Sequence, residues 1–157
     1  MRRRVTGQTG RVRFDPTVDD EVRKAVQAGL RAYNDSSSPV LRGYRERGED
    51  KEVPFDLYAY DDAGELAGGI VASTWGGWLA IDLVWVREDQ RGTGLGSDLL
   101  QRIEQRARDE RGCVGVRLDT WGFQAKPFYE KQGYTVFGVL EDYPPGETEY
   151  LLSKRLD

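Results

Sequence analysis

A glycine-rich turn between an apolar segment and an amphipathic one is the part of the sequence best suited to bind a ligand. It reads Arg91-Gly-Thr-Gly-Leu-Gly96 and directly follows Val84-Trp-Val86. A helix that begins at such a turn leaves main-chain N–H groups without partners and carries about half a positive charge at its first turn. Because glycine has no Cβ, an anion can approach these N–H groups closely. The segment therefore predicts a phosphate-binding loop.

Three known phosphate-binding patterns can be compared with this loop. A Walker loop needs a Lys after its last glycine, and none is present here. A dinucleotide fingerprint needs Gly-x-Gly-x-x-Gly, whereas the spacing here is Gly-x-Gly-x-Gly and position 97 is Ser97. Asp119 ends the next apolar segment, where a ribose-binding acid would stand, so a Rossmann-type nucleotide enzyme stays an alternative. The third pattern, Arg-x-x-Gly-x-Gly, is met by Arg91, Gly94 and Gly96.

The composition limits the chemistry further, because the 157 residues contain no His and one Cys. Ser-His-Asp and Cys-His nucleophiles are excluded, as is a zinc site that needs imidazole, and we expect no metal. One Cys cannot form an internal disulfide, and Cys113 is expected to be a small core residue. Carboxylates, tyrosine, lysine, main-chain groups or a cofactor must carry any reaction.

A second motif, Ala125-Lys-Pro-Phe-Tyr129, lies about 30 residues after the loop and is followed by Gly133-Tyr134. In this order and spacing the two motifs resemble those of the GNAT superfamily of N-acetyltransferases, from about residue 55 to the end. The resemblance implies acetyl-CoA as co-substrate, with its pyrophosphate on the loop and its pantetheine arm along the preceding strand, which splays from the next one. It implies Tyr129 as the acid that protonates the departing thiolate. The implied cofactor-binding residues are Val84, Trp85, Val86, Arg91, Gly92, Thr93, Gly94, Leu95, Gly96 and Ser97.

The general base must be sought among the carboxylates, because an alkylamine is mostly protonated at neutral pH. Asp82 lies in the cofactor strand, where alternation puts it on one face with Val84 and Val86. If buried there, its pKa should be raised, which favours a base. A plain Asp at a strand bulge or sheet edge is the equal alternative. Asp119 is the second choice.

The acceptor is expected to be a primary amine, because acids and aromatic residues suit a cation. Trp75 and Trp78 flank the Gly76-Gly77 turn, and Glu141 and Glu147 lie between the last two strands. With Asp119, these are the candidate substrate contacts. We expect direct acetyl transfer to a small-molecule amine without an acyl-enzyme. A GNAT-like module that binds CoA or a metabolite without catalysis is the alternative.

The elements that must position these residues form an α/β fold of the α+β kind. Alternation predicts strands at 11–14, 55–60, 66–75 and 78–86, and the 3.6-residue period predicts helices from Thr17 to about Asn34 and from Leu95 to Gly112. A strand at 114–118, a short helix at 124–131 and strands at 135–140 and 149–156 follow. We expect one domain over residues 1–157 with a loose end at 1–10. Its mixed, mostly antiparallel sheet is flanked by helices.

The overall charge bears on partners and location. The net charge is −4 and the pI about 5.1, which argues against a nucleic-acid partner. No run approaches the ~20 apolar residues of a membrane helix, and the basic start lacks the apolar stretch of a signal peptide. We therefore expect a cytoplasmic protein without a membrane partner. The sequence leaves a homodimer open.

Overall fold

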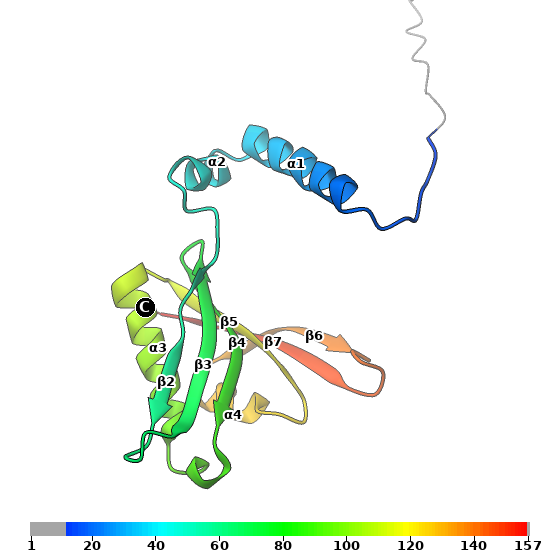
Figure 1. The fold of residues 1–157 in the computed structure, drawn as a ribbon. Coiled ribbons are helices and arrows are strands. Elements are labelled where there is room, and N and C mark those ends of the chain that lie inside the picture. The colour runs from blue at the N-terminus through cyan, green and yellow to red at the C-terminus, as the bar shows by residue number, and fades with distance from the viewer. Residues whose placement is uncertain (1–11, 157) are drawn as a thin grey trace, which may run out of the picture. The chain divides into compact units, whose positions relative to one another are not determined.

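The computed structural model describes residues 12–156, which divide into two compact units between Arg42 and Gly43. The first unit holds α1 (Asp20–Ser37) and the start of α2 (Pro39–Glu46) (Figure 1). Asp19 caps α1, because its side chain accepts hydrogen bonds from the main-chain N–H groups of Glu21 and Val22. The predicted helix is confirmed, and it begins and ends about three residues later than the sequence predicted.

The strand predicted at 11–14 is wrong for residues 12–14, which form neither strand nor helix. Asp15 ends this stretch in a turn: it accepts from Thr17 N at 3.1 Å and pairs with Arg13 at 3.0 Å. Val12 and Phe14 alternate correctly but lack a neighbouring strand to pair with among the described residues. Arg11 and the expected loose end at residues 1–10 lie outside the described part of the chain.

The second unit is built on a mixed seven-stranded sheet with the order β1-β3-β4-β5-β7-β6, and β2 also pairs with β3. The β4–β5 pair is parallel, and all other pairs are antiparallel. The predicted fold class is confirmed. The strands are β1 (Val53–Pro54), β2 (Leu57–Tyr60), β3 (Leu66–Trp75), β4 (Trp78–Val86), β5 (Gly115–Trp121), β6 (Thr135–Glu141) and β7 (Thr148–Arg155).

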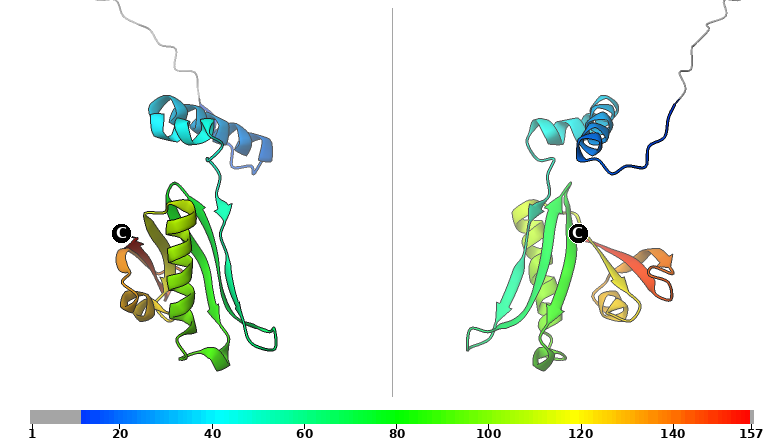
Figure 2. Two further views of the ribbon diagram at one scale, coloured as in Figure 1. Left: turned by 90° about the vertical axis from the view of Figure 1, so that its left-hand side faces the viewer. Right: turned by 45° about the vertical axis from the view of Figure 1, so that its right-hand side comes forward.

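One face of β2–β4 is covered by α3 (Leu95–Arg111), which runs along the strands (Figure 2). Its apolar stripe supplies Leu100 and Ile103, both fully buried against Ile70 and Leu79 of the sheet. Gly112 ends the helix in the left-handed conformation, as its place in the sequence predicts. The short helices η1 (Glu88–Gln90) and α4 (Lys126–Lys131) precede α3 and follow β5.

β4 and β5 separate halfway along β4. They pair from Trp78↔Gly115 to Ile81↔Leu118, and β4 then continues without a β5 partner to Val86. The predicted splay between these strands is thus present. No helix in the described residues is both long and apolar enough to cross a membrane.

Candidate active site

The loop before α3 has the conformation that an anion-binding turn requires. Gly92 and Gly94 have φ of +76° and +96°, and the position of a Cβ on either would meet open space within 4 Å. Main-chain bonding of the helix starts only at Asp98, whose N–H donates to Gly94 O at 3.0 Å. The preceding N–H groups of the first turn therefore lack intrahelical acceptors. The sequence prediction of a phosphate-binding loop is consistent with this geometry.

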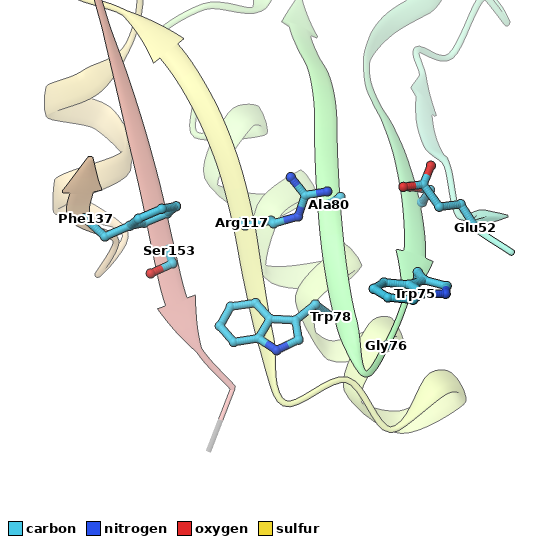
Figure 3. Close-up of a pocket in the computed structure, with 9 residues that line it drawn as sticks. Glu52, Trp75, Gly76, Trp78, Ala80, Arg117, Phe137 and Ser153 are labelled. Carbon is cyan, nitrogen blue, oxygen red and sulfur yellow. The ribbon is translucent and has the colours of Figure 1, made fainter. Parts of the chain in front are cut away.

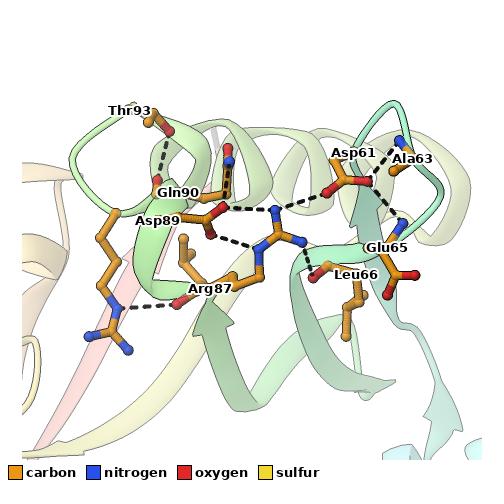
Figure 4. Close-up of polar contacts among 10 residues, drawn as sticks. Asp61, Ala63, Glu65, Leu66, Arg87, Asp89, Gln90 and Thr93 are labelled. Atoms are coloured by element: carbon orange, nitrogen blue, oxygen red, sulfur yellow. Dashed lines mark hydrogen bonds and ion pairs between the residues drawn. The ribbon is translucent and has the colours of Figure 1, made fainter.

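Two polar networks hold the loop in place (Figure 4). Within the loop, Arg91 Nε donates to Val86 O at 3.2 Å and Thr93 Oγ1 to Gln90 O at 2.7 Å. Before the loop, the Arg87 guanidinium lies between Asp61 and Asp89, at 2.9 and 2.6 Å. The loop is therefore tied both to the end of β4 and to the β2–β3 turn.

The electrostatics of the Arg87 network follow from these bonds. The main-chain N–H of Glu65 and the Arg87 guanidinium hold the pKa of Asp61 below its usual value. The guanidinium also lowers the pKa of Asp89. Both carboxylates stay charged at neutral pH and keep Arg87 fixed. Sequence analysis missed Arg87, because nothing in its local pattern pairs it with an acid 26 residues away.

A cleft of about 550 Å³ opens where β4 and β5 separate. A second pocket of about 420 Å³ lies over the glycine loop and shares five of its lining residues, so the two are ends of one continuous depression. The shared residues are Val84, Val86, Arg91, Ala125 and Tyr129. The structure thus brings the loop, the free edge of β4 and the predicted acid together.

Tyr129 lies where the two parts of the depression meet, on α4, and is 7% exposed. Its ring packs edge-on against those of Phe128 and Tyr134, with centroids 5.2 and 5.8 Å away. Burial, together with the charge of Asp119, raises the pKa of Tyr129 to about 12. At neutral pH it is a phenol with a proton to donate.

A buried polar triad behind Tyr129 was not anticipated from the sequence. Tyr134 Oη donates to Glu104 Oε1 at 2.7 Å, and Lys154 Nζ donates to Glu104 Oε2 at 2.6 Å. Glu104 is 7% exposed. Burial of Tyr134, together with the charge of Glu104 and the hydrogen bond to it, raises the pKa of Tyr134. The available signal was a Glu on the apolar stripe of α3, four residues after Leu100. The triad ties together α3, the segment between α4 and β6, and β7.

A second contact joins α4 to the glycine loop. Gln132 Nε2 donates to Ser97 Oγ at 2.9 Å. Ser97 lies in the first turn of α3 and also lines the loop pocket. The end of the helix that carries Tyr129 is thereby fixed to the helix start that faces an anion.

Asp82 and Asp119 both line the cleft with Tyr129, as their candidacy requires. Asp82 is exposed, so the burial that would favour it as a base is not present. Of the two alternatives, the strand bulge is the one observed: Val71 pairs with Leu83 and Ala72 with Ile81, which makes Asp82 the extra residue of a β-bulge. The expected simple alternation with Val84 and Val86 is therefore wrong. The bulge changes which face each following residue takes.

Trp75 and Trp78 lie in a different pocket, of about 450 Å³, on the sheet (Figure 3). Arg117 lines the same pocket, and its positive charge makes the pocket less suited to a cationic acceptor. The ring of Trp78 also fills the space above Gly115, where a Cβ would lie 2.6 Å from it. The structure does not bring these two residues into the Tyr129 cleft.

Glu141 and Glu147 lie at the β6–β7 hairpin and do not line the cleft either. The tip of that hairpin is nevertheless held beside it, since Trp121 Nε1 donates to Tyr143 O at 2.8 Å. Cys113 is 2% exposed and its burial raises the pKa of its thiol, in keeping with the predicted core role. Among the described residues there is no group of three or more His, Cys, Asp or Glu able to hold a metal ion.

Comparison with known proteins gives this arrangement a context. Residues 20–134 match the family model described as Acetyltransferase (GNAT) family. The chain is 45% identical over 130 residues to blasticidin-S acetyltransferase of Streptomyces morookaense, covering 81% of this chain and 96% of that protein. An acetyltransferase from Bacillus cereus ATCC 14579 is 30% identical, with a TM-score of 0.75 over 91% of this chain and 97% of that one. An aminoglycoside 6'-N-acetyltransferase complexed with coenzyme A shares the fold at 18% identity and a TM-score of 0.60, over 82% and 87% of the two chains.

These similarities decide between the readings that the sequence left open. A Rossmann-type enzyme is wrong, because that fold needs a mostly parallel sheet and β4–β5 is the one parallel pair recorded in the described sheet. A module that only binds CoA is disfavoured, because the matched relatives are acetyltransferases. The protein is a member of the GNAT family of acetyltransferases.

Proposed function

We propose that the protein transfers the acetyl group of acetyl-CoA directly to a primary amine of a small molecule, and that blasticidin S is the first acceptor to test. The observation that carries the proposal is the continuous depression that joins the glycine loop, the free edge of β4 and Tyr129. The acceptor is chosen because the Streptomyces relative, 45% identical, is named for it.

The residues of the depression fit the donor. The N–H groups at the start of α3 and the open space at Gly92 and Gly94 suit a pyrophosphate. Beyond Ile81, the edge of β4 has no β5 partner, so an extended amide chain can add there as a further strand. Val84, Trp85 and Val86 form that edge. When bound, acetyl-CoA supplies an activated acyl group.

The protein's own residues then manage two protons. A carboxylate, Asp82 by preference or Asp119, accepts a proton from the ammonium directly or through water, which frees the nitrogen lone pair for attack. Tyr129 donates its phenol proton to the leaving sulfur and regains one from the nitrogen through solvent. Overall the nitrogen loses two protons, of which one ends on the CoA sulfur and the other in water.

A thiol-release assay with acetyl-CoA and a panel of amines, including blasticidin S, tests the proposal. We expect release that depends on the amine, with mass spectrometry locating the acetyl group on the acceptor nitrogen. Release that needs no acceptor, or an acetyl group found on oxygen, would contradict it.

Direct transfer has its own control. Incubation with acetyl-CoA alone should leave the protein unacetylated by intact mass, because Cys113 is buried with a raised pKa. Cys113→Ser should turn over as fast as the unmodified chain. An acetylated protein that passes its acetyl group to the amine would replace direct transfer with an acyl-enzyme route.

A further inference from the structure

The rim of the cleft carries a pair of parallel aromatic rings that the proton transfers above do not use. Trp121 ends β5 and lines the cleft, and Phe123 follows two residues later. Their ring centroids lie 6.2 Å apart with an interplanar angle of 5°. Phe123 is 67% exposed. A flat apolar surface therefore stands open to solvent at the entrance to the site.

The Trp121 ring and the main chain that leads to Phe123 are held firmly with respect to the cleft. The indole Nε1 of Trp121 donates to Tyr143 O at 2.8 Å, which fixes the ring against the β6–β7 hairpin. Between the two rings, the main-chain N–H of Gly122 donates to Thr148 O at 2.9 Å. A preorganised ring surface loses little entropy when a ligand stacks on it.

Negative charge accompanies the rings on the same face of the sheet. Asp119 is two residues before Trp121 on β5, which places the two on one face roughly 7 Å apart. Glu149 of β7 is the cross-strand partner of Trp121 and shares that face. Arg117, two residues before Asp119, shares this face but is farther from Trp121 along β5 and lines the neighbouring Trp75–Trp78 pocket. From the cleft outward, the order is therefore acid first and flat ring next.

We propose that the acceptor is an arylalkylamine or heteroarylalkylamine: a primary ammonium group joined by a short chain to a flat ring. The ring stacks on Trp121 and Phe123, and the ammonium reaches Asp119 beside Tyr129. A chain of about two or three carbons spans the spacing along β5. This substrate class rests on the proposed amine transfer, within which it is an acceptor class distinct from blasticidin S.

The test compares phenethylamine with cyclohexylethylamine, which have the same charge and chain but a flat and a puckered ring. Their dissociation constants are measured by calorimetry on the protein saturated with CoA, and their turnover by thiol release. We expect phenethylamine to bind about three- to tenfold more tightly, the range of an aromatic pair. Phe123→Leu should lower this ratio toward the share that Trp121 alone supplies, and Phe123→Tyr should restore it.

Phe137→Leu is the matched control, because Phe137 is 61% exposed but lines the other pocket. It should leave the ratio unchanged. Equal binding of the two amines, or a ratio that Phe123→Leu does not alter, overturns the ring assignment while amine turnover still supports acetyl transfer. A rise in the KM for acetyl-CoA alone assigns the rings to the donor and also overturns it. Ring-selective binding without turnover supports the assignment and removes the proposed function instead.

Discussion

Tyr129 combines the properties that a proton donor needs. It is buried at the junction between the loop pocket and the cleft, and its pKa of about 12 keeps it protonated at neutral pH. The sequence motif predicted the residue, but not its environment. Phe128 precedes Tyr129 by one residue and Tyr134 follows it by five. The turn of the chain at α4 brings both rings into edge-on contact with Tyr129.

Tyr129→Phe removes the proton and keeps the ring. We expect kcat to fall about 10²-fold, the usual range for a lost general acid, with little change in acetyl-CoA affinity. Steady-state kinetics with a calorimetric measurement of acetyl-CoA binding checks this. The matched control is Tyr60→Phe, because Tyr60 on β2 is 63% exposed. Its kcat should equal that of the unmodified chain. An unchanged kcat in Tyr129→Phe would remove the tyrosine from the mechanism.

The choice between Asp82 and Asp119 can be made from the pH dependence. If Asp82 is the base, Asp82→Asn should lower kcat/KM about 10²-fold at pH 7. That loss should shrink as the pH approaches the amine pKa of about 10, because the substrate then arrives neutral. A loss that is constant with pH would mean that Asp82 only shapes the bulge. A loss in Asp119→Asn that shrinks toward the amine pKa would assign the role of base to Asp119.

At the scale of elements, the sequence predicted β3 and β4 to the residue, since alternation is strong and Gly76-Gly77 marks the turn with two positive φ values. It left the bulge at Asp82 as one of two equal alternatives, because a bulge is a mismatch between two strands and neither strand alone decides it. The same limit applies to the Glu104 triad. Its three members come from α3, the segment between α4 and β6, and β7, up to 50 residues apart.

The triad should stabilise the packing of these elements on one another. Lys154→Met leaves the buried Glu104 with one neutral partner, so we expect a loss of about 1–3 kcal/mol in the free energy of unfolding. Urea unfolding measures it. In the double variant Lys154→Met, Tyr134→Phe the loss should exceed the sum of the single losses, because Glu104 then has neither recorded donor. Strict additivity would show that the three side chains act independently.

At the scale of the whole molecule, the residues that line the depression all lie between Ile81 and Tyr129, within the second unit. The absence of His from the sequence, which first excluded several mechanisms, is consistent with this site. Its titratable side chains in the cleft are two carboxylates, a phenol and a guanidinium. The sequence could not show the long-range strand and helix pairings that bring these groups to one cleft.

The two buried tyrosines give the molecule a characteristic alkaline behaviour. Burial raises the pKa of Tyr129 to about 12, and burial with the charge of Glu104 raises the pKa of Tyr134. A phenol ionises near pH 10 in the unfolded chain, so between that pH and the folded pKa the unfolded state binds fewer protons. The stability contributed by each phenol is therefore complete below about pH 10 and is lost as the pH rises further.

We expect the free energy of unfolding to fall between pH 10 and pH 12 by about 2–3 kcal/mol on account of Tyr129 alone. Urea unfolding at a series of pH values measures the slope. Tyr129→Phe should remove that share of the slope while Tyr60→Phe leaves it intact, since the first ring has lost the group that titrates and the second is on the surface. A slope that is the same in Tyr129→Phe as in the unmodified chain would show that the phenol is already solvated in the folded protein. Such a phenol would titrate near 10, and the alkaline limit of kcat would then fall at that lower pH.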